Sequence, residues 1–158
     1  MKTIFQILGI TLITLFMGIN LQAQSIDHTI AKQYYQEAKT IAEKDNGKLW
    51  GLNLYGPLLF VDGDTKLGIA NYPVEIDGWE EDHGIYFGKL PDNMGLANTA
   101  FEWNGVQWSM IIFKALAKDP HSRASLMMHE LFHQHEEKLG LLSDHKGSKH
   151  LDQKMGRV

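Results

Sequence analysis

Three histidines and three glutamates lie within ten residues of this chain, in the stretch HELFHQHEEK from 129 to 138. His129 and His133 are four residues apart, so on a helix their imidazoles lie one turn apart on the same face and can bind one metal ion. Glu130 lies about 100° further round the helix, where its carboxylate can accept a proton from a metal-activated water molecule. The spacing therefore predicts a zinc centre with two histidine ligands and Glu130 as general base.

The alternative interpretation is a solvated helix face on which the histidines fall by chance. We expect roughly one chain in a few hundred to carry His-Glu-x-x-His by accident, so the surroundings of the motif must decide. Met127 and Leu131 project away from the two histidines, which lets the helix bury one face and present the ligands on the other. His135 lies about 240° from His129. It is predicted to be a surface residue outside the metal site.

The motif resembles the active-site helix of the zincin metallopeptidases. A second stretch, NTAFEWNG from Asn98 to Gly105, resembles the edge strand that thermolysin-like peptidases carry a similar distance before their zinc helix. In that family the strand backbone pairs with the extended substrate. The resemblance implies a zinc-dependent peptidase whose peptide or protein substrate binds along Asn98 to Trp103. An ordinary hairpin strand is the alternative for this stretch.

A third zinc ligand must come from elsewhere in the chain. Glu136 and Leu139 stand where astacin- and reprolysin-like peptidases carry a glycine and a third histidine, which excludes that branch. The resemblance to gluzincins implies a carboxylate nineteen or twenty residues beyond the second histidine, and Asp152 lies at nineteen. Asp144 is the second candidate, in a nearer loop. For both residues the alternative is an aspartate that caps a helix or is solvated.

Gluzincins also use a downstream histidine or tyrosine to stabilise the oxyanion. His145 and His150 are the candidates for this role by proximity alone. The sequence ends in MGRV at Val158 without a clear stop signal, so a truncated and inactive peptidase fragment, lacking its third ligand, is a further interpretation.

The composition excludes several other kinds of site. The chain contains no cysteine, which rules out disulfides, thiolate zinc sites, a cysteine nucleophile and a lipoprotein anchor. A net charge of -4 in 158 residues gives no sign of nucleic-acid binding, which calls for a basic face. The acidic stretch from 75 to 82, EIDGWEED, lacks the regular spacing of a calcium hand and is predicted to be a solvated loop.

The first 23 residues have the order of an export signal. Lys2 precedes an apolar stretch from 4 to 19, and Ala23 supplies the small residue that signal peptidase prefers. We therefore expect a signal peptide over 1–23, and a mature protein over 24–158 that is periplasmic or secreted and has no stable membrane anchor. The alternative is an uncleaved anchor, although the apolar stretch is short for a spanning helix and has no basic flank.

The elements that must position the motif form one α+β domain. A helix is expected over 26–44, with Ile30, Tyr34, Ala38 and Ile41 at helical spacing. About five strands should follow in a largely antiparallel sheet, over 57–62, 66–72, 84–90, 98–103 and 106–113. Asn104–Gly105 predicts a tight hairpin between the last two, the second of them a central strand. The motif helix should run from Asp119–Pro120 to Leu139, with Gly140 as its stop, and a short helix should begin at Ser148.

Two other functions compete with a secreted zinc peptidase. A non-catalytic binding module would keep the same scaffold, with or without metal, and present its sheet edge to a partner. A structural domain with an accidental motif would bind no zinc.

Overall fold

The computed structural model describes residues 26–141. Several predicted features lie outside these residues: the signal peptide, the helix from Ser148, and Asp144, His145, His150 and Asp152. The described elements follow in the order α1 (His28–Asp45), β1 (Leu58–Val61), β2 (Leu67–Ala70), β3 (Glu80–Asp82), β4 (Ile85–Lys89), β5 (Thr99–Trp103), β6 (Val106–Ile112), the 3₁₀ turn η1 (Phe113–Ala115) and α2 (Pro120–His133). The domain is α+β, as predicted.

The first helix, α1, begins at a side-chain cap and ends at a left-handed residue. The carboxylate of Asp27 accepts the backbone N–H groups of Thr29 and Ile30 at 2.8 and 3.1 Å, and Asn46 ends the helix with a φ of 48°. Its buried face consists of Ala31, Tyr35, Ala38 and Ala42. This face is rotated from the predicted one. Ile30 is 39% exposed, whereas its neighbour Ala31 is fully buried.

The sheet contains six strands within residues 26–141, in the order β3-β4-β2-β1-β6-β5. The pair β1–β6 is parallel and the other pairs are antiparallel. The predicted hairpin β5–β6 is confirmed, through Asn104 and Gly105 with φ values of 52° and 73°, and β1 also pairs antiparallel with β2. One strand was not predicted: Glu80–Asp82, at the end of the supposed acidic loop, pairs with β4 as β3.

The central strands of the sheet, β1 and β6, are buried on both faces. One face packs against α1 and α2 through a core that includes Tyr35, Phe60, Ile111 and Leu131. The other face carries Leu59, Val61, Trp108 and Met110, which are covered by partly buried side chains of the connecting loops. Residues of both orientations along β1 are therefore fully buried, which explains its continuous apolar run.

The second helix, α2, begins as predicted and ends earlier than predicted. Asp119 accepts the backbone N–H of Ser122 at 2.8 Å, and Pro120 occupies the first turn. The helix ends at His133 instead of Leu139, because its last turn tightens: the N–H of Gln134 bonds to the carbonyl of Leu131. Turns follow as far as Gly140, whose φ is 72°.

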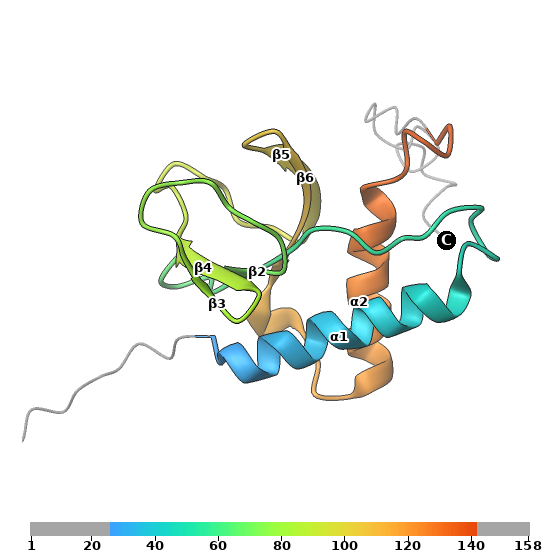
Figure 1. Ribbon diagram of the computed structural model, residues 1–158, viewed down its shortest axis with the longest axis horizontal. Helices are drawn as coiled ribbons and strands as arrows, with labels where there is room; N and C mark the ends of the chain where they lie inside the picture. Colours follow the sequence, from blue (N-terminus) through green and yellow to red (C-terminus); the bar gives the residue numbers. More distant parts are fainter. Residues whose placement is uncertain (1–25, 142–158) are drawn as a thin grey trace, which may run out of the picture.

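Hydrogen bonds fix α2 against the sheet and the segment that precedes β1. The buried hydroxyl of Ser109 on β6 donates to the backbone carbonyl of Glu130 at 2.7 Å. The side-chain amide of Gln134 donates to Pro57 O at 2.6 Å and to Ser109 Oγ at 2.7 Å. Figure 1 shows the result: α2 crosses α1, and the β5–β6 hairpin lies beside α2. No helix in the part of the chain described here is long and apolar enough to span a membrane.

Candidate metal centre

The two histidines of the motif face one another at the C-terminal end of α2. The Nε2 atoms of His129 and His133 are 3.0 Å apart, and the rings are nearly perpendicular, at 88°. Two imidazoles that bind one tetrahedral zinc ion at 2.0–2.1 Å place their nitrogens about 3.3 Å apart. The described geometry is close to that value, so these side chains fit as two ligands of one metal ion.

The carboxylate of Glu130 is buried beside the two histidines. The residue is only 4% exposed, and its Oε2 atom is buried with no hydrogen-bond partner among residues 26–141. Burial raises the pKa of this carboxyl above its ordinary value, and the neighbouring His129 and His133 act in the opposite direction. A buried carboxylate oxygen without a partner is costly. The Oε2 atom of Glu130 is therefore suited to bind a water molecule or a cation.

Glu136 contacts one histidine of the pair in a way that sequence reasoning missed. Its Oε1 lies 3.0 Å from Nδ1 of His133, on the side of the ring opposite to Nε2. A carboxylate on the far nitrogen of a metal-binding histidine fixes the ring's orientation and tautomer. The three-residue spacing between His133 and Glu136 could have predicted this contact, since such residues lie close together on a helix. The sequence analysis used Glu136 only to exclude the astacin- and reprolysin-like peptidases.

The third histidine of the stretch is separate from this centre. His135 does not approach the facing histidines, as expected, but it is half-buried instead of lying on the surface. Its Nε2 lies 3.3 Å from the carbonyl oxygen of Leu54, and burial lowers the pKa of its imidazole. The early end of α2 explains the difference, because the turns that follow bring His135 to the segment before β1.

The described residues supply two candidate metal ligands, His129 and His133, and no third. Within 26–141 no group of three or more His, Asp or Glu side chains is arranged to hold a metal ion. The two predicted candidates for the third position, Asp152 and Asp144, lie outside the described residues.

Two hollows meet at the histidine pair, and both are lined by His129 and His133. The first, of about 700 Å³, lies between β5 and α2. It is also lined by Asn98, Thr99 and Glu130, so the predicted edge strand and the predicted general base share one cleft. The second, of about 470 Å³, lies between α1 and α2 and is mostly apolar.

No family model, curated protein or solved structure matches this chain.

Proposed function

We propose that this protein is a zinc-dependent peptidase that hydrolyses peptide bonds by means of an activated water molecule. The observation that carries the proposal is the arrangement of three side chains in one cleft: the Nε2 atoms of His129 and His133 face each other at 3.0 Å, and the buried carboxylate of Glu130 lies beside them. Two histidines that can share a metal ion and a neighbouring carboxylate are groups that metal-assisted hydrolysis uses, which supports the proposal.

Each of these side chains has a separate role in the reaction. A zinc ion bound at the two histidines would polarise the scissile carbonyl and acidify a water molecule. Glu130 accepts the proton of the attacking water and later donates it to the leaving amine. Its burial suits both steps, because a raised pKa brings the carboxyl closer to the range in which it can give the proton back.

The edge strand β5 offers a binding site for an extended peptide or protein substrate. Thr99–Trp103 is the last strand on its side of the sheet, among the strands described, and Asn98, Thr99 and Ala100 line the cleft that contains the histidines. A peptide that adds to such an edge gains backbone hydrogen bonds whatever its sequence. The carbonyl to be cleaved then lies next to α2.

We further propose that the protein acts outside the cytoplasm, in the periplasm or as a secreted enzyme. The support is the order of a basic residue, an apolar stretch and Ala23 in the first 23 residues.

A second candidate function is a non-catalytic zincin-like binding module, or an inactive fragment of a peptidase. It is favoured by one observation: the described residues contain two ligands and no third, and two side-chain ligands with water hold zinc weakly. Such a module would use the exposed β5 edge to bind a partner without cleaving it.

The two functions are separated by hydrolysis of a denatured protein substrate. If the protein is a peptidase, a chelator should abolish cleavage and added zinc should restore it. Glu130→Gln keeps the volume of the side chain and removes its basicity, so it should retain zinc and lose about two to four orders of magnitude in rate. Glu43→Gln, an exposed glutamate on α1, is the control and should cleave like the wild type. Equal rates for Glu130→Gln and wild type would rule out the peptidase at this site.

A further inference from the structure

We propose, on the basis of the metal centre in the function proposed above, that Ser109 and Gln134 are positioning residues for the histidine pair and for Glu130. Buried hydrogen bonds between them fix where α2 ends and how Glu130 lies against the sheet. Neither residue lines the two hollows at the histidine pair, so each acts through its neighbours and not by touching a substrate.

The two side chains form a fully paired polar cluster inside the protein. Ser109, on β6, has no exposed surface; its hydroxyl donates to the backbone carbonyl of Glu130 and accepts from the side-chain amide of Gln134, both at 2.7 Å. The same amide donates to Pro57 O at 2.6 Å. Such a cluster holds one arrangement, because any shift leaves a buried donor without its partner. We call it the Ser109–Gln134 clamp.

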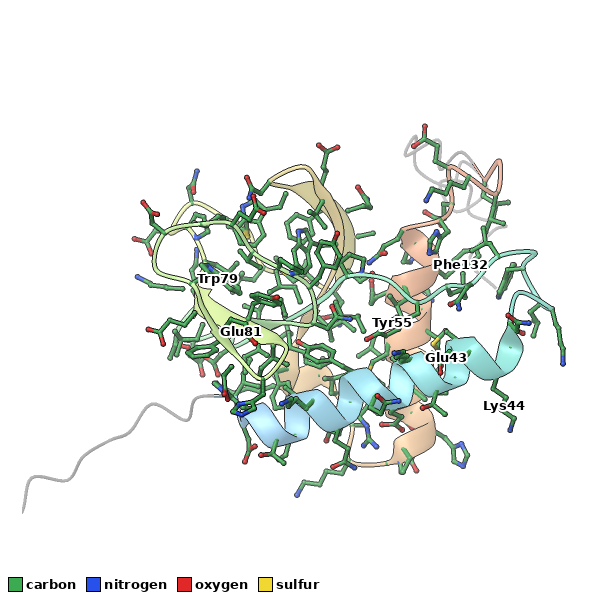
Figure 2. All side chains as sticks on the ribbon, viewed as in Figure 1. Glu43, Lys44, Tyr55, Trp79, Glu81 and Phe132 are labelled. Carbon is green, nitrogen blue, oxygen red and sulfur yellow. The ribbon has the colours of Figure 1, made fainter. Side chains whose placement is uncertain are left out.

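The segment before β1 leaves room for this clamp. It carries Tyr55 and crosses α2 beside the last turn of the helix, where Phe132 lies (Figure 2). Gly56 follows Tyr55, and a Cβ atom at Gly56 would lie 2.4 Å from Oε1 of Gln134. The amide is held by two hydrogen bonds, so it can move away only by giving them up. A residue without a side chain at this position therefore suits the clamp.

The clamp lies where the hydrogen bonding of α2 changes. In a regular α-helix the carbonyl of Glu130 accepts the backbone N–H of Gln134, four residues later. In this protein that N–H donates to Leu131 O at 3.2 Å, the bond of a 3₁₀ turn, while the Glu130 carbonyl accepts the hydroxyl of Ser109. The hydroxyl offers the carbonyl a partner outside the helix, which favours the tighter turn at this point.

The tighter turn brings Glu136 to His133. The next backbone N–H, that of His135, also bonds three residues back, to Phe132 O at 2.9 Å. Side chains three residues apart are nearly eclipsed in a 3₁₀ turn, whereas in an α-helix they are offset by about 60°. This geometry favours the 3.0 Å contact between Glu136 Oε1 and His133 Nδ1. The clamp therefore supports the contact that directs Nε2 of His133 toward His129.

Ser109 also joins the two walls of the cleft beside β5. It is paired in register with Ala100 on β5, and Ala100 and Glu130 both line the cleft. Its hydroxyl therefore fixes the backbone of the proposed base relative to the strand that would bind the substrate. A displacement of about 1 Å between a base and its substrate can lower a rate about a hundredfold.

The ring of His133 reports on the clamp without metal or turnover. In the metal-free protein at about pH 8, where an ordinary imidazole is neutral, ¹⁵N chemical shifts show which ring nitrogen carries the proton. We expect the proton on Nδ1, because a hydrogen-bonded carboxylate, here that of Glu136, selects this tautomer. Ser109→Ala and Gln134→Met should each lower its share about twofold or more. An unchanged share in both variants, or a wild-type proton on Nε2, would overturn the proposal.

Zinc affinity shows whether the clamp acts through Glu136. Gln134→Met keeps the length of the side chain and removes its amide, so it should weaken zinc binding about three- to thirtyfold in competition with a chromophoric chelator. In a protein that already carries Glu136→Gln, it should cause at most about a twofold further loss, because both changes release the same ring. Losses that simply add would overturn the proposal, since Gln134 would then act by another route.

Gly56→Ala tests the clamp from outside α2 and β6. It leaves Ser109 and Gln134 in place and displaces the amide, so it should shift the His133 tautomer in the same direction as Gln134→Met. This variant keeps the test open if Ser109→Ala does not fold. A folded Gly56→Ala protein with the wild-type tautomer would contradict the proposed role of the amide.

Tyr35→Phe is the matched control. It removes another buried hydroxyl that donates to a backbone carbonyl, that of Ile69 at 2.6 Å, between α1 and β2. Its melting temperature should fall about as far as that of Ser109→Ala, while the His133 tautomer and the zinc affinity stay as in the wild type. Equal changes in the two variants would show that the tautomer and the affinity follow lost stability, and would overturn the proposal.

The outcomes separate the clamp from the proposed function. A His133 tautomer that responds to the clamp variants, in a wild-type protein that binds no zinc, would keep the clamp and refute the metal centre. Zinc-dependent cleavage with a tautomer that ignores the clamp variants would keep the peptidase and refute the clamp.

Discussion

At the scale of single residues, the contact between Glu136 and His133 orients the His133 ring. Glu136 is not part of the His-Glu-x-x-His motif. The 3.0 Å distance from the glutamate oxygen to Nδ1 leaves Nε2 free to bind a metal ion, and holds the ring so that Nε2 faces His129. Glu136→Gln should therefore weaken zinc binding about ten- to a hundredfold, the usual effect of losing such a partner. Competition with a chromophoric chelator measures the affinity.

Glu137→Gln is the matched control for this variant. It removes the same charge from the neighbouring residue, which is exposed, whereas the ion pair of His133 is with Glu136. Its zinc affinity should stay within about twofold to threefold of the wild type, since exposed charges contribute little. Equal losses in the two variants would show that Glu136 acts only through its charge and does not position the ring.

The sequence predicted the contacts of this site only between residues within about one helical turn of one another. The spacing of His129, Glu130 and His133 predicted which side chains come together, because residues four apart always share a helix face. It could not place Glu136 or His135. Their positions depend on where the helix stops, and the hydrogen bonds of Gln134 with Pro57 and Ser109 at that end join segments far apart in the chain.

At the scale of elements, an ion pair between a buried arginine and a partly buried glutamate joins the two helices. Arg123 of α2 is bound by both carboxylate oxygens of Glu37 on α1, at 2.8 and 3.2 Å, and lies over the ring of Tyr34. Glu37→Gln leaves the buried guanidinium without its counter-charge. We expect the free energy of unfolding to fall by about 2 to 3 kcal/mol, measured by urea denaturation.

An exposed glutamate of the same helix serves as the control. Glu43 pairs with Lys39 at 3.8 Å in solvent, so Glu43→Gln should change stability by about 0.5 kcal/mol or less. If both variants unfold at the same urea concentration as the wild type, the ion pair of Arg123 does not hold the helices together.

Local patterns predicted the elements better than their pairing. Asn104–Gly105 specified a hairpin, and with it the place of β5 beside β6. The parallel pairing of β1 with β6 joins residues about fifty positions apart, for example Leu59 with Met110, and no short pattern contains that information. Strand β3 was missed because its three residues, Glu80–Asp82, are acidic and their pairing with β4 comes from the sheet itself.

At the scale of the whole molecule, the proposed zinc centre requires a third ligand in addition to His129 and His133. The gluzincin-like spacing points to Asp152, which lies outside the described residues. If Asp152 is that ligand, Asp152→Asn should lose most of its zinc affinity together with any peptidase activity. Asp144→Asn is the comparison. Normal zinc binding in Asp152→Asn with loss in Asp144→Asn would move the assignment to the nearer residue.

The most direct test of the metal centre is anomalous X-ray diffraction, at the zinc absorption edge, from crystals of the full chain grown with zinc. We predict an anomalous peak about 2.1 Å from the Nε2 atoms of both His129 and His133, with the Glu130 carboxylate nearby but not bound to the metal. The same map would identify the third ligand directly. A fully ordered histidine pair with no peak between its nitrogens, at saturating zinc, would contradict the metal-centre assignment.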